Sequence, residues 1–269
     1  MAMLLLSVLV GVVTLLALFV DIVRDGAGGI TWEFLTSLDS RRAAAAGIMP
    51  ALVGTAWLML LVALMTVPLG FGAALYLNEF APPGRLRRFI DLNIANLAAV
   101  PSVVYGLLGL AVFVRFLGLD RSVLAGAMTL TLLLLPIVVV ASREALHAVP
   151  DSIRQAAYGA GATRMQVVRM QVLPAAIPGM MTGMILGLSR AIGETAPLIT
   201  LGALTYVTFV PASPMDGFTA MPIQIFNWVS RPQPEFQNVA ASGIMLLLGM
   251  LLAMNALAIF IRNRYEQRW

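Results

Sequence analysis

The chain has 269 residues, of which 60% are hydrophobic and only 11% are charged. This composition is too apolar for a soluble domain and indicates one integral unit that crosses a membrane several times. The absence of cysteine excludes disulfides and thiolate metal sites, and the single histidine, His147, leaves too few ligands for an imidazole metal site, so we expect no bound metal.

Arginine supplies all 17 basic residues, and the chain contains no lysine. A phosphate-binding loop needs its lysine to reach the nucleotide phosphates, so we expect any ATP-hydrolysing motor to be a separate chain. The basic character of the chain also raises the possibility of nucleic-acid binding. The arginines are scattered over loops without a basic face and interleaved aromatic residues, which argues against nucleic acid as a partner.

Six apolar stretches are long enough to cross the hydrocarbon core as helices of about 20 residues. They cover 3–23, 50–77, 94–116, 122–141, 175–204 and 240–261. The first stretch lacks a positive leading region and a small-residue cleavage pattern, so it is interpreted as a retained anchor and not as a signal peptide.

The distribution of arginine predicts that both termini are cytoplasmic. In that orientation the inner loops hold ten arginines and the outer loops six, in agreement with the tendency of positive charge to stay inside. The inner set is Arg85, Arg87, Arg88, Arg143, Arg154, Arg164, Arg169, Arg262, Arg264 and Arg268, and the outer set is Arg24, Arg41, Arg42, Arg115, Arg121 and Arg231. Two long outer segments, 24–49 and 205–239, either cap the helices or receive an extracytoplasmic partner.

A polar, arginine-bearing segment at 143–174 separates the fourth and fifth apolar stretches. Pro150 suits the first turn of a helix and Gly159 suits its end, which predicts a short helix over 151–158. Small residues would let another protein approach this bend closely, although the segment is equally compatible with a compact loop. These small residues are Ala156, Ala157, Gly159 and Gly161.

A second short helix is predicted to begin just after Thr163. Thr163 and Gln166 have the spacing of a capping box, in which each residue satisfies the backbone of the other. Helical periodicity places Met165, Val168 and Val172 on one face of this helix.

Arg190 and Glu194 are two charges inside the fifth apolar stretch. They are four residues apart, so on a helix they share a face and can pair. An arginine at the bilayer centre costs about 2.5–3.5 kcal/mol on insertion scales, so an intramembrane charge is by default a functional hypothesis. We expect either a buried pair that lines an anion pathway or an interhelical ion pair that only fixes packing.

The same stretch predicts close helix packing and a bend. Gly179, Gly183, Gly187 and Ala191 recur every four residues, which forms a ridge of small side chains. Pro197 cannot donate to the carbonyl of Gly193, so a kink is expected there, with these two residues as the hinge.

The polar segment resembles the cytoplasmic loop through which ATP-binding cassette (ABC) importer permeases engage their ATPase subunits. The family motif has the form E-A-A-x-x-x-G, nine variable residues and then I-x-L-P. Two positions depart from it, because Gln155 replaces the glutamate and Gln171 replaces the isoleucine. The matching positions that the resemblance assigns to ATPase coupling are Gln155, Ala156, Ala157, Gly161, Leu173 and Pro174.

Three further strings resemble the A-type permease of the bacterial phosphate-specific transport (Pst) family. They are Arg190-Ala191-Ile192-Gly193-Glu194-Thr195-Ala196-Pro197, Pro101-Ser102-Val103-Val104-Tyr105-Gly106-Leu107 and Phe218-Thr219-Ala220-Met221-Pro222-Ile223-Gln224-Ile225. This resemblance implies a substrate pathway that contains Arg190, Glu194 and Thr195.

The resemblance also implies the architecture. We expect an all-α membrane protein with six transmembrane helices of the ABC importer type I permease architecture, and a single transmembrane permease domain over 1–269. Its parts are an anchor and outer segment at 1–49, a permease core at 50–262, a coupling loop at 143–174 and a cytoplasmic tail at 263–269.

The implied partners are a homologous PstC-type permease, two PstB-type ATPase subunits that carry ATP and magnesium, an extracytoplasmic phosphate-binding protein and the lipid of a bacterial inner membrane. This chain would bind no cofactor and catalyse no reaction. Phosphate is the implied substrate, and sulfate, molybdate or phosphonate is the first alternative. An ion-gradient-driven transporter or channel would show an inverted repeat, which is not evident here, and a membrane scaffold would leave the two intramembrane charges unexplained.

Overall fold

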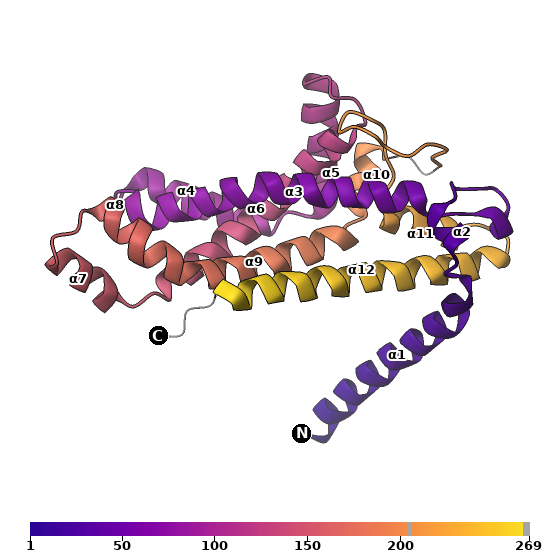
Figure 1. The fold of residues 1–269 in the computed structure, drawn as a ribbon, viewed down its shortest axis with the longest axis horizontal. Coiled ribbons are helices and arrows are strands. Elements are labelled where there is room, and N and C mark those ends of the chain that lie inside the picture. Colours follow the sequence, from indigo (N-terminus) through magenta and orange to yellow (C-terminus); the bar gives the residue numbers. More distant parts are fainter. Residues whose placement is uncertain (204–205, 266–269) are drawn as a thin grey trace. The chain divides into compact units, whose positions relative to one another are not determined.

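The computed structural model describes residues 1–203 and 206–265, and helices dominate this part of the chain (Figure 1). The long helices are α1 (Ala2–Gly26), α3 (Met49–Leu75), α6 (Val123–His147), α9 (Leu173–Gly193) and α12 (Glu235–Tyr265). The shorter ones are α2 (Trp32–Thr36), α4 (Arg85–Ala98), α5 (Ser102–Gly109), α7 (Asp151–Gly159), α8 (Arg164–Val167), α10 (Ala196–Leu201) and α11 (Met221–Val229).

Wider π-helical turns extend three of these helices, and short 3₁₀ turns lie in the outer segment. The π-helical turns are Tyr76–Phe80 after α3, Leu110–Phe116 after α5 and Val168–Val172 between α8 and α9, and the 3₁₀ turns are Ala27–Gly29 and Ala43–Ala45. Some of the sequence predictions fall on residues that the structure does not describe. These are Leu204, Thr205 and the predicted tail from 266 onward, which includes Arg268. The side chain of Arg264 is also not described.

Within residues 1–203 and 206–265, five helical segments are long and apolar enough to cross a membrane. They are Leu4–Gly29, Met49–Phe80, Val123–His147, Arg164–Gly193 and Glu235–Phe260, and each overlaps one of the predicted spans.

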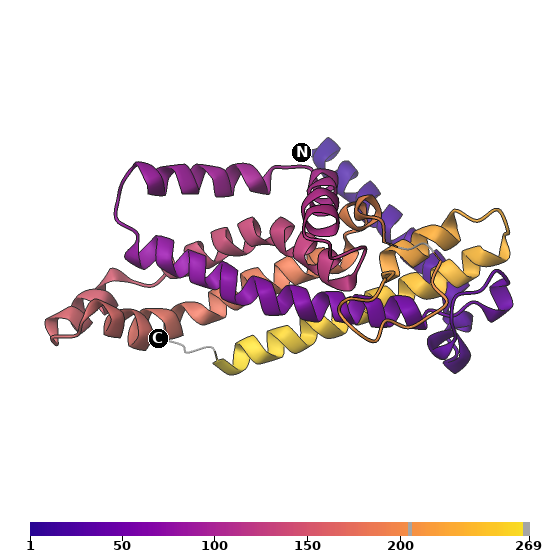
Figure 2. The same ribbon diagram turned by 90° about the horizontal axis from the view of Figure 1, so that it is seen from above.

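The third predicted span, 94–116, is wrong as a single straight helix. In its place α4 ends at Ala98 and α5 begins at Ser102, and the bend between the two segments is 105°. Figure 2 shows that the two helices run in different directions. Pro101 explains the break, because proline lacks a backbone N–H and its ring disfavours helical geometry at the residue before it. A sixth crossing exists only if this bent pair is counted as one span.

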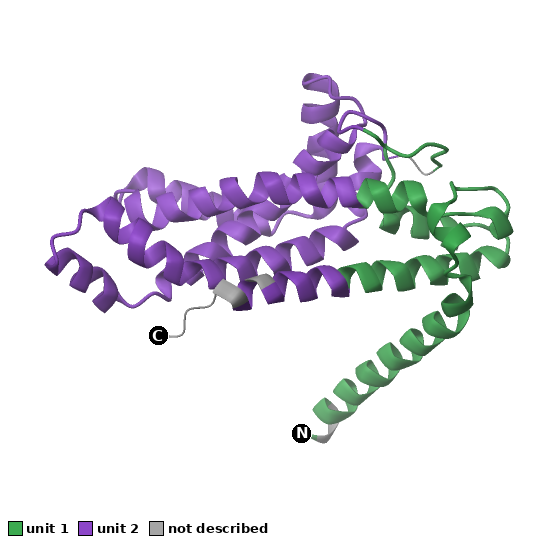
Figure 3. Cartoon of the chain, viewed as in Figure 1, with its two compact units in different colours: residues 1–55, 204–212, 218–251 green, residues 56–203, 213–217, 252–269 purple. Residues whose placement is uncertain are grey.

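The chain divides into two compact units, coloured separately in Figure 3. Unit 1 comprises Met1–Thr55, Leu204–Ala212 and Phe218–Leu251, and unit 2 comprises Ala56–Ala203, Ser213–Gly217 and Leu252–Trp269. The division therefore passes through α3 and α12. All of the candidate functional residues from α7 to α10 belong to unit 2.

Unit 1 is organised around a buried aromatic cluster and a buried acid. Asp39 accepts a hydrogen bond from Trp228 Nε1 at 3.2 Å and pairs with Arg231 at 3.3 Å. The guanidinium of Arg231 also lies 4.3 Å from the ring centre of Phe236. The apolar members of the cluster are Phe34, Ala46, Ile48, Ala51, Met221, Trp228, Phe236 and Ala240.

In unit 2, α6 and α9 pack directly against each other, and the ridge of small residues explains how. A β-carbon added at Gly183 would lie 2.4 Å from Ala141 Cβ, and one added at Gly179 would lie 2.7 Å from Ala145 Cβ. At Gly187 the corresponding distance to Val138 Cγ2 is 3.3 Å. The predicted glycine ridge is therefore confirmed as the contact face of α9, since a β-carbon at Gly179 or Gly183 would separate the two helices.

Candidate functional site

Helix α7 forms the predicted first part of the polar segment. It covers Asp151–Gly159 with Pro150 at the N-cap, so the expected helix over 151–158 is confirmed. The left-handed turn that follows is made by Gly161, whose φ is +83°, and not by Gly159. A residue without a β-carbon is favoured at Gly161 because L-residues rarely adopt this conformation.

The predicted capping box at the start of α8 is also confirmed. The backbone N–H of Thr163 donates to Gln166 Oε1 at 2.8 Å, and the Thr163 side chain accepts from the backbone N–H of Gln166. These two bonds satisfy N–H groups that have no partner within the helix.

The predicted apolar face of this second helix is partly wrong. Val168 and Val172 are buried as expected, but Met165 is 61% exposed, and Val167 takes the inward position. The π-helical turn Val168–Val172 accounts for the difference, because an extra residue in the turn shifts the faces that a 3.6-residue period would place together.

A concave groove lies between α7 and α8. Its volume is about 380 Å³, and half of its lining residues are alanine or glycine. Ala157 and Gly161 of the predicted coupling motif line it, while Gln155 and Ala156 are exposed on α7. The full lining is Ala157, Ala160, Gly161, Ala162, Gln166, Val167, Met170 and Gln171. The loop thus presents a hollow with little side-chain bulk, which suits the approach of another protein's surface.

The last two predicted coupling residues join the loop to the long helix. Leu173 is the first residue of α9 and packs against a buried cluster formed by α3, α6 and the loop, and Pro174 occupies the first turn of α9. Because α8, the π-helical turn and α9 are continuous from Arg164 to Gly193, the loop and the next charged site lie on one helical path.

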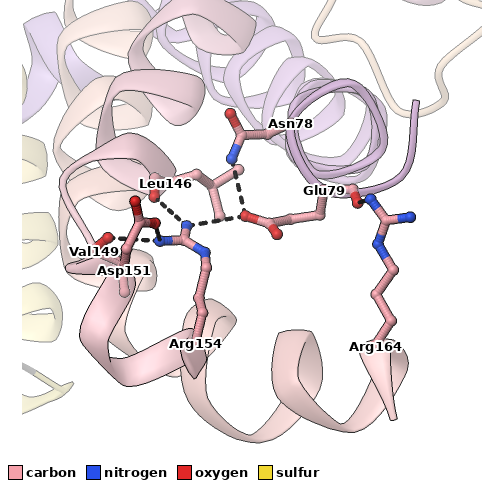
Figure 4. A network of polar contacts seen from close by, with 7 residues as sticks. All are labelled: Asn78, Glu79, Leu146, Val149, Asp151, Arg154 and Arg164. Atoms are coloured by element: carbon pink, nitrogen blue, oxygen red, sulfur yellow. Dashed lines mark hydrogen bonds and ion pairs between the residues drawn. The ribbon is translucent and has the colours of Figure 1, made fainter. Parts of the chain in front are cut away.

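An arginine that the motif does not include holds the loop in place (Figure 4). Arg154 on α7 donates to the carbonyl oxygens of Leu146 in the last turn of α6, at 2.9 Å, and of Val149 just after that helix, at 2.6 Å. It also pairs with Asp151 at 3.2 Å and with Glu79 at 3.1 Å. Arginine at this position is favourable because the end of a helix leaves carbonyl groups without partners and carries partial negative charge.

Glu79 is held from two sides. Its carboxylate pairs with Arg154 and accepts from Asn78 Nδ2 at 2.9 Å, while its backbone carbonyl accepts from Arg164 of α8. The Arg164 guanidinium lies 5.4 Å from the ring centre of Phe80. In the sequence, Arg154 and Arg164 bear only on the predicted orientation, and Glu79 is not among the predicted site residues. An acid directly after an apolar stretch is the one local signal for Glu79.

The second predicted site lies at the far end of α9. Arg190 Nε and Glu194 Oε1 are 2.9 Å apart, so the predicted ion pair is confirmed. The expectation that it is buried is wrong for Arg190, whose side chain is 55% exposed, against 15% for Glu194. The reason is that the glycine ridge turns toward α6, which leaves Leu186 and Arg190 on the exposed face of α9.

The expected kink at Pro197 is a complete break. Helix α9 ends at Gly193, Glu194 caps it with an extended ψ of 115°, and α10 begins at Ala196 with Pro197 in its first turn. The hydroxyl of Thr195 donates to the carbonyl of Gly193 at 3.3 Å across the break. Glu194 therefore reaches Arg190 from beyond the helix end.

Next to this break, helix α10 packs closely against helix α5. Gly106 of α5 faces α10 so closely that an added β-carbon would lie 2.6 Å from the Pro197 carbonyl oxygen and 2.7 Å from Pro197 Cα. Residues 101–107 and 190–197, singled out separately in the sequence, thus meet in space. Ser189, next to Arg190, donates to Asn255 of α12 within the same unit.

Within residues 1–203 and 206–265, no group of three or more His, Cys, Asp or Glu residues is placed to hold a metal ion. The charged groups of both sites are instead arranged as arginine-carboxylate pairs. The arrangement can present an exposed guanidinium on an apolar helix and a grooved loop at the other end of that helix.

Comparison with known proteins places these features in a family. The family described as "Binding-protein-dependent transport system inner membrane component" matches residues 66–269. A probable ABC transporter permease protein, YqgI, from Bacillus subtilis is 30% identical over 91% of this chain and 87% of its own length. A probable phosphate transport system permease protein, PstA, from Methanocaldococcus jannaschii is 32% identical over 96% of this chain and 90% of its own length.

The fold agrees with a solved transporter. A chain of the bacterial alginate ABC transporter, in complex with an alginate pentasaccharide-bound periplasmic protein, superposes with a TM-score of 0.70 at 16% identity. The match covers 98% of this chain and 93% of that one. At this identity the likeness concerns the fold alone.

Proposed function

Because the chain belongs to the binding-protein-dependent transport system inner membrane component family, we propose that it is a permease subunit of an ATP-driven importer of inorganic phosphate. The observation that carries the choice of cargo is Arg190, an exposed guanidinium on an apolar helix. A guanidinium offers a planar fork of donors that matches phosphate oxygens, and its charge does not titrate in the physiological range. The name of the M. jannaschii relative supports the same cargo.

In this proposal, Arg190, Glu194 and Thr195 line half of the pathway. Exposure of Arg190 within this chain leaves it free to face a pathway shared with a second, homologous permease of the PstC type. Glu194, 2.9 Å from Arg190 Nε, offsets part of the positive charge. The offset keeps phosphate binding weak enough for release, since a lone desolvated guanidinium would hold a multiply charged anion tightly.

The motor is assigned to two PstB-type ATPase subunits, which supply ATP, magnesium and the hydrolysis step. The chain itself has no lysine for a phosphate-binding loop. The α7–α8 groove and the exposed residues Gln155 and Ala156 would receive the ATPase. Gln155 lacks the charge of the family glutamate, so its contact would be a hydrogen bond and not a salt bridge.

Transport then follows as a change between two states. ATP binding draws the ATPase subunits together, which displaces the α7–α8 loop of each permease and shifts the pair between inward-open and outward-open arrangements. Gly193 and Pro197 flank the break between α9 and α10 and would act as the hinge. An extracytoplasmic phosphate-binding protein would deliver the anion on the opposite side.

This arrangement requires a topology in which the α7–α8 loop faces the ATPase in the cytoplasm. Both termini are then cytoplasmic in a bacterial inner membrane, as the excess of arginine on that side favours.

The test of cargo is a competition experiment. The chain is expressed with its native partners, and uptake of labelled phosphate is measured with excess unlabelled phosphate, sulfate, molybdate or phosphonate. We expect only unlabelled phosphate to compete at equal concentration. Absence of labelled phosphate uptake, or stronger competition by another of these anions than by unlabelled phosphate, would support the alternative that this permease carries that oxyanion.

A further inference from the structure

Glu79, Arg154 and Arg164 form a polar connection between the end of α3 and the α7–α8 loop, beside the apolar cluster in which α3 and the loop also pack. We call these three residues the Glu79 clamp. We propose that the Glu79 clamp transmits displacement of the loop to α3, so that Glu79 and Arg154 are positioning residues for coupling. The inference rests on the proposed function, because it requires an ATPase that moves the loop.

The chain connectivity shows why an extra connection is needed. The loop follows α6 and leads into α9, so a push on the loop reaches these two helices through the backbone. Helix α3 lies elsewhere in the sequence, and its path to the loop is made by side chains. The π-helical turn Tyr76–Phe80 at the end of α3 carries Glu79, the residue that Arg154 and Arg164 of the loop bind.

Glu79 is bound by both helices of the loop at once. Arg154 of α7 pairs with its carboxylate at 3.1 Å, and Arg164 of α8 donates to its backbone carbonyl (Figure 4). Gly161, with φ of +83°, joins α7 to α8. Because α7 and α8 both bind Glu79 in the turn that follows α3, a rotation or translation of the loop as a body carries Glu79 with it.

The environment makes this pairing difficult to break. The side chains of Arg154 and Glu79 are only 16% and 12% exposed, so separating them would leave two charges poorly solvated. Arg154 is further fixed by the carbonyl oxygens of Leu146 and Val149 at 2.9 and 2.6 Å. Most surface ion pairs lack such additional bonds and contribute little.

The position of Arg154 on α7 connects the clamp to the proposed ATPase contact. Gln155 and Ala156, the next two residues, are exposed, whereas the Arg154 side chain points back to α3 and α6. Helix α7 therefore carries the proposed ATPase contact on one face and a residue of the Glu79 clamp on another. A force applied at Gln155 is delivered to Arg154 within a single helical turn.

The clamp can be tested in the reconstituted complex of this chain with its permease partner, ATPase subunits and binding protein. The variants are Glu79→Gln, Arg154→Gln and the charge-conserving Glu79→Asp. The control is Glu144→Gln, which removes the same charge from an exposed residue near the end of α6. Phosphate imported per ATP hydrolysed, the maximal uptake rate, and the concentration of loaded binding protein that gives half-maximal uptake are measured for each.

We expect Glu79→Gln and Arg154→Gln to copurify with the ATPase subunits and to import about tenfold less phosphate per ATP, the ratio that corresponds to about 1.4 kcal/mol of lost coupling. The half-maximal concentration stays unchanged, because the contact with the binding protein is not altered. Glu79→Asp imports more phosphate per ATP than Glu79→Gln but less than the wild type, and Glu144→Gln imports as much as the wild type.

Two outcomes would contradict the proposed role of the Glu79 clamp in coupling. One is a wild-type ratio of phosphate to ATP in assembled Glu79→Gln. The other is loss of assembly in Glu79→Gln and Arg154→Gln together with a wild-type ratio in assembled Glu79→Asp, which would make the pair purely structural. A wild-type complex that imports no phosphate would instead overturn the proposed function, and the two failures are therefore separable.

Discussion

Gly106 and Pro197 approach so closely that a β-carbon on Gly106 would stand 2.7 Å from Pro197 Cα. Substitution by alanine therefore has to displace backbone, not only the end of a flexible side chain. Gly106→Ala is expected to push α10 from α5 and to disturb the adjacent Glu194–Thr195 break, at an overpacking cost of about 1–3 kcal/mol. The measurement is phosphate uptake at matched expression, and we expect a clear reduction.

The matched control for this substitution is Gly72→Ala. Gly72 lies on α3 within the same unit, and an added β-carbon there meets nothing within 4 Å. It is expected to retain wild-type uptake. Equal uptake in the two variants would show that the close approach of α5 and α10 has no bearing on transport.

Arg190→Gln tests the pathway directly. Removing a charged donor to the anion should lower uptake about tenfold or more, because a hydrogen bond to a charged group contributes about 1.5–3 kcal/mol. Arg190→Lys should restore only part of it, since an ammonium lacks the bidentate fork. Expression and copurification with the ATPase are checked in parallel.

Arg115→Gln serves as the control for loss of a positive charge. Arg115 is exposed on the π-helical turn that follows α5. Wild-type uptake by Arg190→Gln at normal expression would remove Arg190 from the pathway.

The features that the sequence predicts correctly are those determined by local spacing. The capping box of Thr163 and Gln166 depends on three residues of separation, and the ridge from Gly179 to Gly187 depends on a repeat of four, so both can be identified without knowing what lies opposite. The pairing of Arg190 with Glu194 follows from the same kind of spacing.

The features that the sequence does not predict depend on tertiary context. Exposure of Arg190 is determined by which face of α9 meets α6, and a stretch that is apolar throughout does not reveal this. The exposed position of Met165 results from a π-helical turn, which alters the period on which the prediction depends. Glu79 and Arg154 are 75 residues apart, so their pairing has no local signal.

Substitutions at Gly161 separate backbone strain from loss of the coupling surface. An added β-carbon there meets nothing within 4 Å, so the cost comes from its φ of +83°, about 1–2 kcal/mol for an L-residue. We expect Gly161→Glu to keep the ATPase bound but to uncouple hydrolysis from uptake. Gly161→Asn, which tolerates this backbone conformation, should be milder.

Gly118 offers a control, because its backbone also adopts the left-handed conformation. Its φ is +66°, it also has open space around it, and it lies between α5 and α6, away from the α7–α8 loop in the sequence. Gly118→Glu should introduce similar strain and leave the ratio of uptake to ATP hydrolysis unchanged. Normal coupling in Gly161→Glu would contradict the assignment of the α7–α8 loop.

Breaking the buried Asp39–Arg231 pair of unit 1 is expected to lower the stability of the protein. The Asp39 side chain is 2% exposed and pairs with Arg231, so Arg231→Met leaves a carboxylate that is buried without its counter-charge. The expected loss is about 3 kcal/mol, at the lower end for a broken buried pair because Arg231 is itself 16% exposed.

This loss is measured as a lower thermal unfolding temperature of the purified protein. Adding Asp39→Asn to Arg231→Met should recover part of the stability, since the uncompensated charge is removed. Additive destabilisation by the two substitutions would show that the residues do not interact energetically.

Helices α6 and α9 allow a graded test of close packing. A β-carbon would lie 2.4 Å from Ala141 Cβ at Gly183 but 3.3 Å from Val138 Cγ2 at Gly187. Gly183→Ala therefore has to separate the helices, and about 1–3 kcal/mol of destabilisation is expected. Gly187→Ala needs a shift of only a few tenths of an ångström by a side chain and should cost less.

The order of thermal unfolding temperatures is the measurement, with wild type highest, Gly187→Ala next and Gly183→Ala lowest. Ala141→Gly in the Gly183→Ala background supplies the critical control, because it removes the atom with which the new methyl group collides. Recovery of stability in that double variant requires the two helices to be in contact at these positions. No recovery, or the reverse order of the single variants, would contradict the observed contact between α6 and α9.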